Sequence, residues 1–113
     1  MADWTNELMA EFEHADEARA RDNEGRARVC ARRAAGIAIR EYLARQGQPT
    51  PNSSAYNLIR QLRDEPGLSP ELIRACDFLT LRVNEEFKLP VEMDLVSEAR
   101  KLCQGLLTDW DGN

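Results

Sequence analysis

The residue types that most often do chemistry are scarce in this chain, which has one His and three Cys among its 113 residues. Cys30, Cys76 and Cys103 form no CxxC pair, so the sequence predicts no zinc module. Each cysteine falls on the apolar stripe of a predicted helix, where a free thiol fills space like a small hydrophobe. We therefore predict no cofactor and no metal, and the unpaired cysteines indicate a reducing, cytoplasmic compartment.

The single histidine, His14, lies in the acidic sequence EFEHAD. Glu11 and Glu17, three residues to either side, share its helix face, but a metal would need further ligands. We interpret His14 as a surface residue. Adjacent carboxylates such as Glu85 and Glu86 arise by chance among 20 acidic residues, and no Walker or GxSxG pattern occurs. The sequence thus assigns no catalytic residue.

Arginine dominates the basic residues, because thirteen of the 15 Lys and Arg residues are Arg. Residues 1–17 hold six acids and no Arg or Lys, whereas residues 18–45 hold eight Arg and three acids. Arg26, Arg33 and Arg40 are spaced by seven and therefore share one stripe of a helix. Because guanidinium groups bind phosphate oxygens in pairs, this stripe favours a groove for nucleotide phosphate or an RNA backbone. The alternative is structural: the stripe pairs with the acidic first helix or braces a dimer.

Length and charge limit the number of domains and the kinds of partner that the chain can have. A chain of this size is one domain, predicted over residues 1–113 with its core at about 4–107 and a polar, frayed tail at 108–113. The net charge of −5 argues against duplex DNA, which needs a broad basic face. No apolar run is long enough for a membrane span, and the acidic start does not resemble a signal peptide.

Apolar spacing predicts helices throughout and no strand. The longest helix, at about 24–45, is apolar around most of its circumference and rich in Ala and Gly, which predicts a central position. The other apolar stripes run over residues 4–15, 55–62, 72–83 and 95–106. Short loops between them predict an all-α, up-and-down four-helix bundle with a short additional helix.

Local signals mark where the helices begin and end. Gly47 suits the position after a helix, and Pro70 suits a first helical turn. Side chains that accept a hydrogen bond from the backbone precede the helices. The predicted N-caps are Asp3 or Thr5, Ser53 or Ser54, Ser69, and Asp94.

Four segments, RVCARRAAGIAIREYLARQG, AYNLIRQL, SPELIRACDFLTLRVNEEFKLP and EARKLCQGLL, together resemble the HEPN domain family over residues 8–107. The resemblance rests on helix order, on the small-residue, basic second helix that ends in Gly47, and on the loop before the last helix. It implies an up-and-down bundle that forms a homodimer. Members of this family include ribonucleases of toxin–antitoxin systems, partners of minimal nucleotidyltransferases, and proteins proposed to bind nucleotides.

The ribonucleases of that family use an Arg followed, four to six residues later, by a His. Arg82 matches the Arg, but the positions for the His hold Phe87, Lys88 and Leu89. The chain therefore lacks the group that exchanges a proton near neutral pH. Lys88 begins a Lys-Leu-Pro sequence that is similar to an Arg-Tyr-Pro tripeptide found in another subgroup of the family.

These observations predict a cytoplasmic, non-enzymatic HEPN-like homodimer that binds a nucleotide, RNA or a protein partner, such as a nucleotidyltransferase. One alternative is a divergent ribonuclease toxin. Another is a purely structural interaction module, with Trp4 and Phe12 of the first helix in its interface. The residues predicted to contact phosphate are Arg33, Arg40, Arg82, Asn84 and Lys88.

Overall fold

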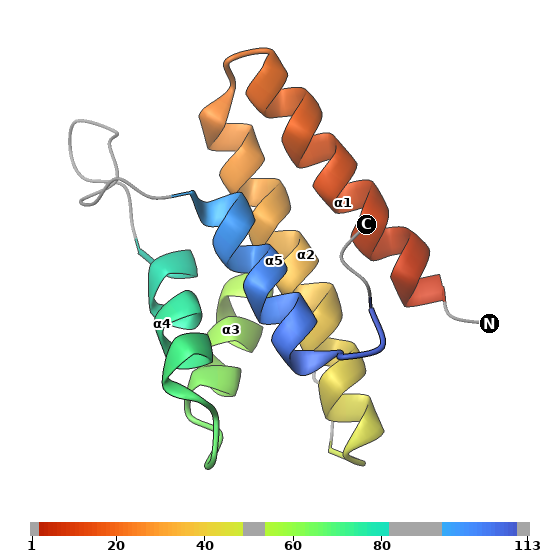
Figure 1. Cartoon of the computed structure of the whole chain (residues 1–113), viewed down its shortest axis with the longest axis vertical. Helices are drawn as coiled ribbons and strands as arrows, with labels where there is room; N and C mark the ends of the chain where they lie inside the picture. Colours follow the sequence, from red (N-terminus) through yellow and green to blue (C-terminus); the bar gives the residue numbers. More distant parts are fainter. Residues whose placement is uncertain (1–2, 49–53, 82–93, 111–113) are drawn as a thin grey trace.

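The computed structural model describes residues 3–48, 54–81 and 94–110, and within these ranges the chain is helical, with no strand (Figure 1). The all-α prediction is confirmed. No helix in the described ranges is long and apolar enough to cross a membrane. The helices are α1 (Asp3–Ala20), α2 (Glu24–Arg45), α3 (Ala55–Arg63), α4 (Pro70–Leu79) and α5 (Leu95–Leu106).

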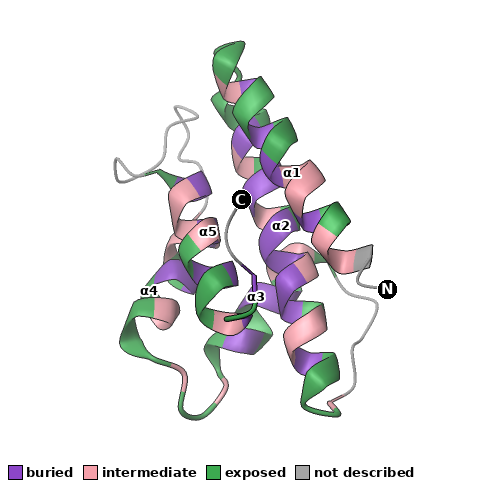
Figure 2. Cartoon of the chain, turned by 45° about the vertical axis from the view of Figure 1, so that its right-hand side comes forward, coloured by how far each residue is buried: buried purple, intermediate pink, exposed green. Residues whose placement is uncertain are grey.

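Helix α2 occupies the centre, as its all-round apolar surface predicted. It packs against α1, α3 and α5, while α4 packs against α3 and α5. Buried residues follow α2 along most of its length in Figure 2. Small side chains let the neighbouring backbones approach closely, and those at Ala31, Ala34, Ala35, Gly36 and Ala38 are all buried.

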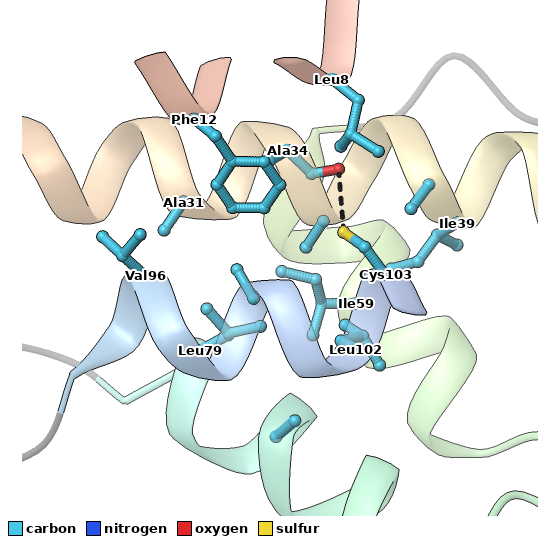
Figure 3. Packing of buried hydrophobic residues seen from close by; sticks show 14 of the residues in the cluster. Leu8, Phe12, Ala31, Ala34, Ile39, Ile59, Leu79, Val96, Leu102 and Cys103 are labelled. Carbon is cyan, nitrogen blue, oxygen red and sulfur yellow. Dashed lines mark hydrogen bonds between the residues drawn. The ribbon is translucent and has the colours of Figure 1, made fainter. Parts of the chain in front are cut away.

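One hydrophobic cluster joins all five helices (Figure 3). Cys103 of α5 lies against α2, with its Sγ 3.8 Å from the carbonyl oxygen of Ala34. Leu8 and Phe12 of α1 belong to the same cluster. Phe12 is 3% exposed, so it is buried in the core and is not available to the partner interface in which the sequence placed it.

Three of the predicted helix starts are confirmed, whereas Asp3 and Thr5, predicted as the N-cap of the first helix, both lie within α1. Ser54, Ser69 and Asp94 each accept a hydrogen bond from a backbone N–H three residues onward, which satisfies a donor that the helix leaves unpaired. Gly47 follows α2 with a φ of +70°, a conformation that glycine adopts without steric cost. Residues 82–83 of the predicted fourth stripe lie outside the described residues, and α4 itself ends at Leu79.

Arg32 joins α2 to the end of α4. Its Nε donates to the carbonyl oxygen of Leu79 at 2.7 Å, and its Nη2 donates to that of Leu81 at 3.1 Å. Helix C-termini leave carbonyl groups without intrahelical partners, so the guanidinium satisfies the carbonyl of the last residue of α4 and that of Leu81 just beyond it. Burial lowers the pKa of Arg32, and the neighbouring Arg28 lowers it further.

The core continues beyond residue 107, so the prediction of a frayed tail is wrong for its first residues. Trp110 is only 6% exposed and stacks on Phe12, with 5.6 Å between the ring centroids. Asp109 is paired with Arg45 at 2.9 Å, which ties the segment to the end of α2. The segment that leads to Trp110 is therefore part of the folded core, although most of its residues are polar.

Candidate phosphate-binding groove

The arginine stripe lies on the face of α2 that its neighbours leave uncovered. Arg26, Arg33 and Arg40 are all exposed. The acids of α1 were one candidate set of partners, but none of the ion pairs between described residues involves Arg26 or Arg33. Neither side chain therefore forms an ion pair with α1, although Glu11 of α1 shares a cavity with Arg33.

Two cavities open on this face of α2, and they share Ile37 and Arg40 as a common wall. The first, of about 300 Å³, lies between α2 and the start of α3 and includes Arg33 and Ser54. The second, of about 260 Å³, lies toward the start of α1 and includes Trp4. Together they form a groove with Arg40 at its middle, which we call the Arg40 groove.

Helix α3 begins against α2 because Gly36 has no side chain. A Cβ at Gly36 would lie 3.1 Å from the Cβ of Ala55 and 3.3 Å from its Cα. This close approach brings Ser54, the N-cap of α3, into the wall of the first cavity. The unpaired N–H groups of a helix N-terminus favour anions, so they add to the positive charge of Arg33 and Arg40.

The two arginines are suited to hold one anionic group between them. Seven residues of helix place their Cα atoms about 10 Å apart along the axis. Two long guanidinium side chains can close that span around a phosphate or diphosphate.

Glu11 of α1 also lines the first cavity and tempers its positive charge. Its Oε1 is buried and has no hydrogen-bond partner within the described part of the chain. Burial raises the pKa of the nearby Cys30 thiol, and the Glu11 carboxylate raises it further. The Cys30 thiol is thus kept neutral. The Glu11 carboxylate would repel an anion bound in the cavity.

The remaining predicted phosphate contacts, Arg82, Asn84 and Lys88, lie outside the described residues, as do Phe87 and Leu89. Of the five predicted residues, the structure describes only Arg33 and Arg40, and these two line the same cavity.

The described residues support the interpretation of the cysteines and the histidine. Cys30, Cys76 and Cys103 are free thiols in the core. Burial raises the pKa of Cys76 and of Cys103 to about 12, so neither is an activated nucleophile. His14 is exposed, as expected of a surface residue.

Several residues that line the groove are not among those that the sequence predicts for phosphate contact. The sequence predicts Trp4 in a partner interface and Ser54 only as a helix cap, and it singles out neither Glu7 nor Glu41. Ser54 carried a local signal for its cap, but nothing in the sequence places it beside Arg33. That proximity depends on the path of the chain between α2 and α3.

Comparison of the chain with family models, with curated proteins and with solved structures finds no match.

Proposed function

We propose that this protein is a non-catalytic helical module that binds a phosphate-bearing ligand in the Arg40 groove. One observation carries the proposal: Arg33 and Arg40 line a single cavity together with the N-terminus of α3. The cavity, at about 300 Å³, is at the lower end of the range for small-molecule sites. A small phosphate ester suits this volume better than a long polyanion.

The HEPN resemblance belongs to the same proposal. In Figure 1, α1, α2, α4 and α5 run in alternating directions, which is compatible with an up-and-down four-helix bundle in which α3 is the additional helix. A homodimer, a nucleotidyltransferase-type partner, a toxin–antitoxin setting and a cytoplasmic location stay predictions. No described residue favours the ribonuclease alternative, because Arg82 and positions 87–89 lie outside the described ranges.

The test is a calorimetric titration of the full chain with inorganic pyrophosphate at low ionic strength, where exposed charges are least screened. A charged hydrogen bond contributes about 1.5–3 kcal/mol, so Arg33→Ala should weaken binding roughly tenfold or more. Arg74→Ala is the matched control, since Arg74 is an exposed arginine on α4 and lines neither cavity of the groove. Equal losses in the two variants would reduce the effect to net charge and refute the site.

Glu11→Gln should change the affinity for pyrophosphate in the opposite direction, at the same cavity. It removes one negative charge from the cavity while keeping the shape of the side chain, so pyrophosphate should bind several-fold more tightly. Combining Arg82→Ala with Lys88→Ala tests whether residues 82–88 contribute. Unchanged binding in that double variant would confine the site to the Arg40 groove, whereas no binding by the wild-type chain would refute the proposed function.

A further inference from the structure

The two cavities of the Arg40 groove are displaced from each other by one turn of α2. The residues of α2 that line the first cavity are Arg33, Gly36, Ile37 and Arg40, and those that line the second are Ile37, Arg40, Glu41 and Ala44. Each residue of the second set follows one of the first set by four positions, which is a rise of about 6 Å along the helix axis. Two groups of one ligand can therefore occupy both cavities if a similar distance separates them.

The electrostatic character of the groove reverses over this turn. The first cavity has Arg33, Arg40 and the N-terminus of α3, which together outweigh the single carboxylate of Glu11. The second cavity has the carboxylates of Glu7 and Glu41, with Arg40 only in the wall that the two cavities share. A phosphate is attracted to the first cavity and a cation to the second.

Trp4 adds an aromatic wall to the second cavity. The face of an indole ring attracts cations, and the guanidinium of Arg45, 5.4 Å from the ring centroid, already makes one such contact. The charge of Arg45 is offset by Glu41 at 2.8 Å and by Asp109 at 2.9 Å. Glu7 is exposed and belongs to none of the ion pairs between described residues, so its negative charge can attract a ligand.

The rest of the second cavity is apolar, since Ile37 and Ala44 complete its wall. A primary ammonium group has three N–H donors that need acceptors, whereas a quaternary ammonium group has none. Its methyl groups pack against aromatic and aliphatic side chains, and its charge is attracted to the ring face. An indole ring, aliphatic side chains and carboxylates together favour a quaternary ammonium ion.

Charge and spacing together select one class of ligand. In a phosphate ester of choline, four bonds of about 1.5 Å each join phosphorus to nitrogen, so the two charged groups lie about 5 Å apart. This span is close to the offset of one helical turn between the cavities.

We infer that the ligand of the Arg40 groove is a phosphocholine group, with its phosphate between Arg33 and Arg40 and its trimethylammonium against Trp4 and Glu7. This inference rests on the proposed function, because it needs the phosphate end of the groove. The same group occurs free, as a phosphate monoester, and as the head group of a phospholipid.

The experiment compares phosphocholine with neohexyl phosphate, the isostere in which carbon replaces the charged nitrogen, by calorimetry on the full chain at low ionic strength. Attraction of the cation to Trp4 and the carboxylates should make phosphocholine bind roughly tenfold more tightly. Glu7→Gln should reduce this ratio several-fold. Glu17→Gln is the matched control and should leave the ratio unchanged, because Glu17 is an exposed residue of α1 that lines neither cavity. Trp4→Leu should also reduce the ratio, and Trp4→Phe should restore part of it.

Vesicles distinguish the two sources of the group. Sedimentation of the chain with phosphatidylcholine vesicles, reversed by free phosphocholine, would assign the groove to the lipid head group. Binding of phosphocholine without sedimentation would assign the groove to the free ester.

The outcomes separate the inference from the proposed function. Pyrophosphate binding that depends on Arg33, with phosphocholine no tighter than neohexyl phosphate, would overturn the inference and leave the proposed function standing. AMP binding more tightly than phosphocholine would likewise overturn it. If Trp4→Leu fails to fold, the ratio in the wild-type chain and in Glu7→Gln is sufficient to decide.

Discussion

Trp110 should be one of the most stabilising side chains of this protein, although it lies four residues beyond the last helix. A tryptophan buries about 150–250 Å². At about 25 cal/mol per Å², its nearly complete burial against Phe12 contributes about 4 kcal/mol or more. Its Nε1–H is buried and has no partner in the described residues, which offsets about 1–3 kcal/mol of that gain. We expect Trp110→Ala to lower the free energy of unfolding by about 3 kcal/mol.

The assay is urea denaturation followed by far-UV circular dichroism, with Trp110→Phe as the matched variant. Phenylalanine keeps a ring stacked on Phe12 and removes the unpaired donor, so its stability should stay within about 1 kcal/mol of the wild type. A loss below about 0.5 kcal/mol in Trp110→Ala would show that the residue does not belong to the cooperative core. Equal losses in both variants would refute the energetic argument about the unpaired N–H.

The remaining predictions concern the packing of α2 and α5, the contact between Arg32 and the end of α4, and the buried thiols. Gly36→Ala should lower the free energy of unfolding by up to about 2 kcal/mol and weaken pyrophosphate binding, because the added methyl group meets Ala55 at the start of α3. Gly105→Ala should raise the free energy of unfolding by up to about 1 kcal/mol, because its methyl group meets only the side chain of Leu72. Thermal denaturation measures both changes. Arg32→Met removes the donors to the carbonyl oxygens of Leu79 and Leu81 and should lower the unfolding free energy by about 1.5–3 kcal/mol, measured in urea. Cys76 and Cys103 should react with an aromatic disulfide reagent only after unfolding. Because unfolded thiols lose their protons near pH 8.5 while these folded ones keep theirs to about pH 12, stability should fall as the pH rises above about 8.5.

Local sequence signals were sufficient for the helices. The four-residue and three-residue spacing of Leu8, Phe12 and Ala15 predicted a buried face of α1, and all three are buried. The N-caps at Ser54 and Asp94 were equally predictable, because a cap depends on one side chain and the three residues that follow it. The end of the core was not predictable in this way, since the polar neighbours of Trp110 conceal a side chain that packs on a residue from the first helix.

The sequence alone determined the helical class, the central place of α2 and the existence of an arginine stripe, because these depend on residue type and on spacing within one helix. Only the tertiary structure decided what the stripe faces. Gly36 brings the start of α3 beside Arg33, and the start of α1 brings Trp4 beside the cavity that Arg40 lines. Such meetings depend on how helices distant in sequence pack together, and no periodicity within one helix encodes them.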